Sequence, residues 1–268
     1  AQANAGNPAP SGFSLALPGG SPWAAQRHDV YGTLQIDAAG PLTPTVLWSY
    51  QLASGFAGGA AVGADGTVYA AGNDGTVVAL DAQGKETQRW TVPAAPVGSP
   101  ALGAGGTVYV VDAQQGLSAL GPGGSTRWRF TSEGRRPTAG PVVGPDGTIY
   151  FTRVDRIQAV SPEGAGLWVS SGVDGTTVET PPRLSPDGSL IFLSNSIFLA
   201  PTGEKSALAL PIKDEMQFMM PTYVTGADGG TYLTAGNNAI RWHVENDQAV
   251  ADNVIAWNVG GLSIYLPT

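Results

Sequence analysis

Histidine, the residue best suited to proton transfer and metal ligation near neutral pH, occurs only at His28 and His243. The two histidines lie in different segments, and neither has a carboxylate at a ligand spacing that recurs, so no metal site is predicted. Asp29 follows His28 and could orient it as a general base. Consecutive residues point in different directions, however, so we interpret Arg27, His28 and Asp29 as a structural knot that closes one face of the fold.

Nucleophilic and calcium-dependent chemistry is also not predicted. The chain has no cysteine, which excludes a thiolate nucleophile, thiolate metal ligands and disulfides. No serine lies in a Gly-x-Ser-x-Gly elbow. Aspartate precedes glycine at several places, but these segments lack the alternating oxygen ligands of a calcium loop, and Asp-Gly is typical of tight hairpin turns. The prediction is therefore a protein that is not an enzyme and has no cofactor. The turns in question begin at Asp65, Asp146, Asp187 and Asp228.

The Asp-Gly turns belong to a phrase that recurs five times, in its clearest form Asp-Gly-Thr-Val-Tyr. The glycine at the second position of this motif recurs every 40, 41, 41 and 41 residues. The five glycines are Gly66, Gly106, Gly147, Gly188 and Gly229. A period of this length indicates one supersecondary unit per repeat.

Each repeat predicts four short strands. In the second repeat the segments are 99–102, 107–111, 116–120 and 126–130, separated by turns rich in glycine. Their apolar runs are nearly continuous, which indicates strands that are covered on both faces. Radial stacking of small antiparallel sheets buries both faces of every sheet, so the predicted fold is an all-β propeller of four-stranded blades.

Tryptophan recurs in the last predicted strand of the units. Such a series could form a stacking platform for sugars, but packing between sheets is the favoured interpretation. The fourth unit has the apolar segment 207–210 in place of a tryptophan. The tryptophans concerned are Trp48, Trp90, Trp128, Trp168 and, after a longer connection, Trp257.

The two chain ends are predicted to complete the ring. Segment 45–52 is interpreted as an outer strand, segment 261–267 as one further strand, and segment 12–18 resembles that last segment. We expect five complete blades and a sixth sheet built from both termini; the alternative is a truncated chain whose intact form has seven or eight blades. Residues 1–21 are expected to form a flexible segment rich in Pro and Gly, and residues 22–268 a single propeller domain.

Charge composition limits the partners. The formal net charge is −8 and only 13% of residues are charged. Arg135-Arg136 is the only adjacent basic pair, so nucleic acid and anionic lipid are not predicted partners. No apolar run approaches the length needed to span a bilayer. The small residues at 1–5 resemble the neighbourhood of a signal-peptidase site, so we expect an exported chain that is periplasmic, at the cell surface or secreted.

Most of the informative charges fall in two kinds of loop. One kind joins the outer strand of a blade to the inner strand of the next, and the other joins the second strand to the third. Both are expected at one face of the propeller, where loops on a rigid scaffold commonly bind partners. The predicted rim residues are Arg135, Arg136, Asp174, Glu179, Asp214 and Glu215 from the connections, with Asp112 and Asp155 from the turns.

The repeats resemble those of pyrroloquinoline-quinone-type (PQQ-like) propellers. The fullest match is Ala79-Leu80-Asp81 followed by a glycine turn and Trp90. Segment 23–29 is similar to the lead-in of exported bacterial members. The resemblance implies a propeller fold over about residues 22–260. Quinoprotein dehydrogenases in this group are much longer and carry a vicinal cysteine pair, which this chain lacks; other relatives, including the lipoprotein scaffold of the outer-membrane assembly machinery, are non-catalytic and bind proteins.

Three functions are therefore considered. The first is a non-enzymatic exported propeller that presents one rim face to a protein partner in the cell envelope or an extracellular assembly. The alternative is a carbohydrate-binding propeller, and the remote alternative is a relative of the quinone-dependent dehydrogenases. The cluster of Met216, Met219 and Met220 is interpreted as core filling rather than as a partner site.

Overall fold

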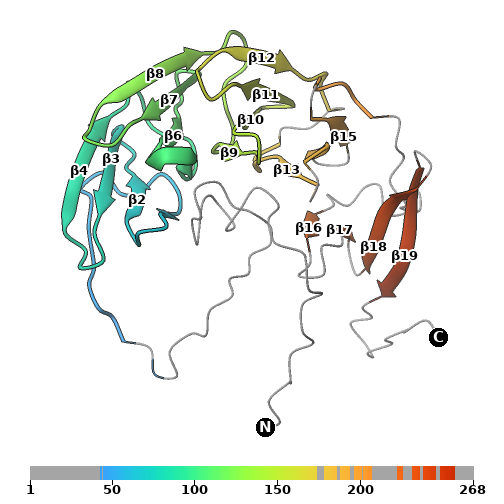
Figure 1. Ribbon diagram of the computed structural model, residues 1–268, viewed down its shortest axis with the longest axis horizontal. Helices are drawn as coiled ribbons and strands as arrows, with labels where there is room; N and C mark the ends of the chain where they lie inside the picture. The colour runs from blue at the N-terminus through green and yellow to red at the C-terminus, as the bar shows by residue number, and fades with distance from the viewer. Residues whose placement is uncertain are drawn as a thin grey trace.

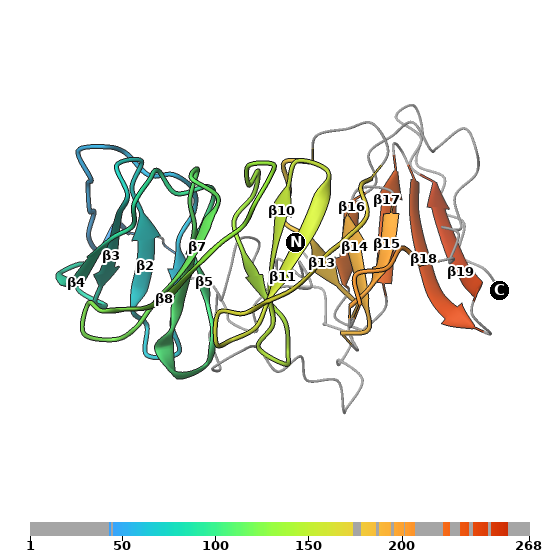
Figure 2. The same ribbon diagram turned by 90° about the horizontal axis from the view of Figure 1, so that it is seen from above.

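The predicted all-β propeller is confirmed. The computed structural model describes residues 43, 45–173, 178–185, 188–193, 196–200, 202–206, 222–225, 231–235, 238–245 and 248–256. These residues form five antiparallel sheets that follow an arc around a common centre (Figure 1). Seen from above, the sheets succeed one another in chain order (Figure 2). Within the described residues there is no α-helix, only a short 3-10 turn at Ala104–Gly106.

Within each sheet the strands pair in chain order, as an antiparallel meander from the inside of the arc to the outside. The first sheet consists of β1 (Ala61–Val62), β2 (Val68–Ala71), β3 (Thr76–Leu80) and β4 (Glu86–Thr91). The second consists of β5 (Ala101–Leu102), β6 (Val108–Val111), β7 (Gly116–Leu120) and β8 (Thr126–Thr131). The third consists of β9 (Val142–Val143), β10 (Ile149–Arg153), β11 (Arg156–Val160) and β12 (Gly166–Val169).

The fourth sheet has three described strands and the fifth has four. They are β13 (Arg183–Leu184), β14 (Leu190–Leu193) and β15 (Ser196–Leu199), then β16 (Thr222–Thr225), β17 (Thr231–Ala235), β18 (Asn238–Glu245) and β19 (Gln248–Ala256). The segment expected as the fourth sheet's last strand, 207–210, lies outside the described residues, as do the terminal segments expected to build a sixth sheet. The strands of the second sheet agree closely with the segments predicted from sequence.

The hydrophobic core lies between neighbouring sheets rather than inside any one of them. One cluster joins Val77 and Ala79 of the first sheet to Val108 and Leu120 of the second, and a larger cluster joins the second, third and fourth sheets. Each sheet therefore has one apolar face toward the preceding sheet and another toward the next. This explains why the strand sequences are apolar without alternation.

The Asp-Gly turns are held by their own side chains. In the first repeat the Asp65 carboxylate accepts hydrogen bonds from the Thr67 backbone N–H (3.0 Å) and hydroxyl (2.8 Å). These hydrogen bonds lower the pKa of Asp65. Gly66 adopts φ +82°, a region that favours glycine. Asp146 and Thr148 repeat the same geometry, so both carboxylates serve the turn.

Trp128 bridges two successive sheets, and Trp48 connects segment 45–52 to the first sheet in the same way. The Trp48 indole donates to the Ala82 carbonyl (3.0 Å), and the Trp128 indole donates to the Pro162 carbonyl (2.9 Å), in each case in the turn between the third and fourth strands of the next sheet. The ring lies against the glycine of that turn: a Cβ at Gly84 would be 2.5 Å from Trp48, and one at Gly164 would be 2.7 Å from Trp128. Only a residue without a side chain fits this contact.

Trp90 departs from the single position that the sequence repeat predicts. It lies opposite Val77, whereas Trp128 lies opposite Ala119, so Trp90 is displaced by two residues along its strand. Its indole donates to Gly121, one residue earlier in the turn, and it is only 4% exposed. The sequence contains this shift, because Trp90 follows the turn glycine Gly84 by six residues, whereas Trp128 follows Gly124 by four.

Segment 45–52 pairs with no strand among the described residues, contrary to the predicted outer strand. Its side chains nevertheless pack as those of an outer strand would. Trp48, Tyr50 and Leu52 cover the face of the first sheet formed by Ala70, Val78 and Leu80. The segment therefore covers this face of the first sheet as a preceding blade would. This agrees with the prediction that Trp48 packs against a neighbouring sheet.

The tryptophan contact gives a stability prediction. Gly164→Ala should lower the free energy of unfolding by about 1–3 kcal/mol more than Gly124→Ala, as measured by urea denaturation. Both glycines have positive φ, +90° and +82°, and occupy the same turn position, so both substitutions carry the same backbone cost. A Cβ at Gly124 would meet only the Arg89 carbonyl at 3.5 Å, because Trp90 is displaced. Equal losses would contradict the proposed role of the Trp128 contact.

Candidate functional site: the loop rim

The connections between sheets and the turns between second and third strands lie at the same face. Backbone hydrogen bonds join them: Val97 donates to Val111 (2.8 Å), and Thr138 donates to Thr152 (3.0 Å). In both cases the connection that enters a sheet runs beside the end of that sheet's second strand. We call this face the loop rim and define it by connections 92–100, 132–141 and 170–173 with 178–182, and by turns 72–75, 112–115 and 154–155.

On the loop rim, Arg135 and Asp155 approach each other. The Arg135 guanidinium lies 3.5 Å from Asp155 Oδ1, and the Arg156 side chain lies 3.9 Å from the same oxygen. This oxygen is buried and accepts no hydrogen bond, so the contact is an ion pair at long range rather than a tight bidentate one. Arg135 is in a connection and Asp155 in a turn, which shows that the two loop types predicted to share a face do meet there.

Asp112 does not belong to the exposed part of the loop rim, contrary to its predicted role in partner binding. Its side chain is fully buried and bonded to both terminal nitrogens of Arg129, at 3.2 Å for Nη2. It also accepts from the backbone N–H of Gln114 (2.9 Å) and Gly116 (3.3 Å). A carboxylate with this many donors inside its own sheet is a structural ion pair.

The remaining predicted rim residues divide into two groups. Arg136 and Glu179 are exposed, in the connections that follow β8 and β12 respectively. Asp174, Asp214 and Glu215 lie outside the described residues, as do Gly229 and Trp257 of the structural repeat and the three methionines.

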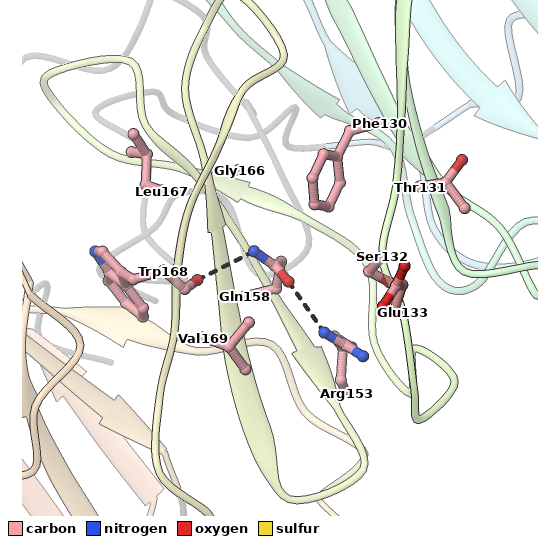
Figure 3. Close-up of a pocket in the computed structure, with 10 residues that line it drawn as sticks. All are labelled: Phe130, Thr131, Ser132, Glu133, Arg153, Gln158, Gly166, Leu167, Trp168 and Val169. Atoms are coloured by element: carbon pink, nitrogen blue, oxygen red, sulfur yellow. Dashed lines mark hydrogen bonds between the residues drawn. The ribbon is translucent and has the colours of Figure 1, made fainter.

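A groove opens on the outer side of the rim, between the second and third sheets (Figure 3). We call it the β8–β12 groove; its volume is about 450 Å³. One wall is the end of β8 and the other is formed by β10, β11 and β12. Its lining residues are Phe130, Thr131, Ser132, Glu133, Arg153, Gln158, Gly166, Leu167, Trp168 and Val169.

The buried charged group of this groove is Arg153, which is only 6% exposed; the other charged residue in its lining, Glu133, is exposed. Its Nε donates to the Arg135 carbonyl (3.1 Å), and Nη1 donates to the Gln158 side-chain oxygen (3.0 Å). Gln158 is held in turn, because its amide nitrogen donates to the carbonyls of Ala159 and Trp168, both at 3.0 Å. Burial, and then the nearby Arg156, lower the pKa of Arg153.

A family model described as outer membrane protein assembly factor BamB matches residues 34–122. The solved structure of BamB from Moraxella catarrhalis is 15% identical, with a TM-score of 0.57 over 77% of this chain and 67% of that one. Residues 34–122 thus match PQQ-like repeats, and the chain shares the β-propeller fold of these structures.

Structures of virginiamycin B lyase from Staphylococcus aureus are similar to this PQQ-like propeller to a comparable degree. One, a catalytically inactive variant with quinupristin, is 17% identical, and another is 16% identical; both have a TM-score of 0.54 over 73% of this chain and 69% of that one. No curated protein matches the sequence significantly. At such identities the structural likeness establishes the fold, and the neighbours include an enzyme as well as an assembly factor.

Among the residues that the structure describes, no group of three or more histidine or acidic side chains gathers as a metal site would require. No helix in that part of the chain has the length and hydropathy to cross a bilayer.

Sequence reasoning missed Arg153, although the repeat contains a signal for it. Asp112 and Arg153 each follow their repeat glycine by six residues, at 106 to 112 and 147 to 153. An alignment of the units of this PQQ-like propeller would therefore have shown a carboxylate replaced by a cation. It would not have shown that Arg153 lines a groove, since that depends on the neighbouring sheet.

The buried pair predicts a large effect within the second blade. Asp112→Ala should lower the free energy of unfolding by about 2–4 kcal/mol, because it leaves Arg129 and two backbone N–H groups without their acceptor. Asp74→Ala is the matched control: Asp74 lies in the corresponding turn of the first blade, is exposed and accepts from the Thr76 backbone N–H (3.0 Å). The loss for Asp74→Ala should be clearly smaller, because water can replace an exposed acceptor. Chemical denaturation of both variants measures the difference, and comparable losses would refute a structural role for Asp112.

Proposed function

We propose that this chain is a non-enzymatic, exported propeller that binds a protein partner in the cell envelope or an extracellular assembly through the loop rim. The observation that carries this proposal is the uneven chemistry of the rim. Connection 92–100 carries no charge, whereas connection 132–141 carries one acidic residue, Glu133, and two basic ones, Arg135 and the exposed Arg136, in a chain with a net charge of −8. A charged loop with a basic excess on a rigid acidic scaffold, beside an uncharged one, favours one asymmetric, complementary partner.

The family supports a role in protein interaction. The matching family model is named for an outer membrane protein assembly factor, and a BamB structure shares the fold. An exported location agrees with that name, so we place the proposed partner in the envelope or outside the cell.

Catalysis is not proposed, although virginiamycin B lyase shares the fold. The fold supports both kinds of protein, so the decision rests on side chains. The sequence offers neither an activated nucleophile nor a recurring pair of histidine and carboxylate, as noted above.

Carbohydrate binding is less well supported than protein binding. A lectin-like propeller would repeat an exposed aromatic ring and a polar partner in each blade. Here the rings of Trp48, Trp128 and Trp168 lie against glycines of the next sheet, and Trp90 is buried. These indoles stabilise the contacts between sheets and are not free to stack on sugars.

The proposal predicts that a partner contacts the rim and not the outer circumference. A photo-crosslinking residue at Arg136 should capture a protein from the native envelope, and the same residue at Arg127 should not, because Arg127 is exposed on the outer strand β8. Arg136→Glu should then weaken binding of the purified partner roughly tenfold, as expected for reversal of a rim charge.

Arg127→Glu is the matched control, since it makes the same charge change away from the rim. Its affinity should remain within about twofold of the unsubstituted chain. Equal crosslinking at the two positions, or equal loss of affinity in the two variants, would mean that the loop rim is not the binding face.

A further inference from the structure

The second and third sheets differ at one pair of equivalent positions on the face toward the preceding sheet. In the second sheet, Asp112 at the end of β6 is paired with Arg129 on the outer strand β8. In the third sheet the corresponding positions hold Arg153 and Val169. The strand registers support this equivalence, because Arg129 lies opposite Ser118 and Val169 lies opposite Gln158 in the two sheets. The third sheet thus keeps a buried cation but has valine where its counter-ion would lie.

Arg153 has no carboxylate partner among the described residues. Its two hydrogen bonds go to neutral acceptors, the Arg135 carbonyl and the Gln158 side chain, and Nη2 has none there. An ionised group that is 6% exposed and has no counter-charge among the residues described around it is costly to hold. A ligand that supplied the missing negative charge would recover part of that cost on binding.

The groove in front of Arg153 suits an anion that carries an apolar group. Figure 3 shows the Arg153 guanidinium beside Gln158, with the Phe130 ring on the facing strand and Val169 next to Gln158. The side chain of Val169 is 45% exposed and that of Phe130 is partly exposed, so apolar surface adjoins the cation. Gln158 is fixed by two carbonyl acceptors, which holds the Arg153 Nη1 contact in place.

The charge of the groove limits the ligand to one negative charge. Glu133 also lines the groove, and a single arginine offers one positive charge. A phosphate monoester carries about two negative charges near neutral pH. A carboxylate carries one and matches the planar fork of a guanidinium.

We propose that the β8–β12 groove binds a monocarboxylate attached to an aromatic or apolar group, with Arg153 receiving the carboxylate and Phe130 and Val169 contacting the apolar part. The carboxylate could belong to a free organic acid or to the carboxyl terminus of a polypeptide. This site adjoins the loop rim at Ser132 and Glu133. Its test does not depend on the proposed partner-binding role, because the purified chain alone should bind the carboxylate.

The test is a titration of the arginine-labelled protein, followed by NMR of the arginine side chains. 3-Phenylpropionate should shift the Arg153 side-chain signals saturably, and 3-phenylpropionamide should bind roughly tenfold to a hundredfold more weakly, as expected for loss of a charge-assisted hydrogen bond. A short peptide that ends in phenylalanine with a free carboxyl group distinguishes the sources. Tighter binding of the peptide identifies a chain terminus, and tighter binding of the free acid identifies a small acid. Equal binding of the acid and its amide, or stronger binding of inorganic phosphate, would overturn the proposal.

Val169→Asp provides a variant that does not remove the buried arginine. It restores the ion pair of the second sheet in reversed order, so it should raise the melting temperature and abolish binding of 3-phenylpropionate. Val169→Asn is the matched control, equal in size and uncharged, and should keep binding within a few fold. Arg153→Gln should lose binding, with Arg127→Gln as the control for an exposed arginine on β8. If Val169→Asp binds the acid as well as the unsubstituted chain does, the groove is not a carboxylate site, whatever the folding of Arg153→Gln.

Discussion

The whole arrangement depends on the contact between a large ring on one sheet and a bare glycine turn on the next. A four-stranded sheet such as the first three, with strands of two to six residues, has too little surface to be stable alone, and both of its faces are apolar. Trp48, Trp128 and Trp168 each fix the distance to the following sheet, because their rings occupy the space that a Cβ at Gly84, Gly164 or Gly203 would fill. Repetition of that contact turns separate sheets into an arc.

The position of the aromatic residue varies between the sheets. Trp90 lies deeper in its interface, and Gly124 consequently has no ring against it. At the fourth sheet the aromatic contact comes from the opposite direction: Trp242 on β18, 2% exposed, packs edge-on against Phe192 on β14 at 5.7 Å between ring centres. Burial of large aromatic surface is therefore more constant between the sheets than the exact position of the residue that supplies it.

The loop rim and the β8–β12 groove are formed by surface that the packing between sheets leaves uncovered. Hydrogen bonds between connections and turns hold the backbone of the rim, so the exposed side chains can differ from blade to blade without disturbing the sheets. The Asp112–Arg129 pair and the Arg153–Val169 pair show such a difference at a buried position. In the second blade the charges neutralise each other, and in the third blade a cation faces the groove. A repetitive scaffold can therefore bind a specific ligand through the side chains that differ between its blades.

The sequence by itself determined the repeat, the four strands of each unit and the Asp-Gly turns, because these depend on local chemistry: hairpin turns need glycine at positive φ, and buried strands need continuous apolar runs. It also indicated that Arg135 and Asp155 would share a face. Only the tertiary structure decided that Asp112 is buried against Arg129 and that Arg153 lines a groove. The reason is physical: burial and the pairing of charges depend on atoms contributed by a different strand or a neighbouring sheet, and residue spacing along one strand does not specify them.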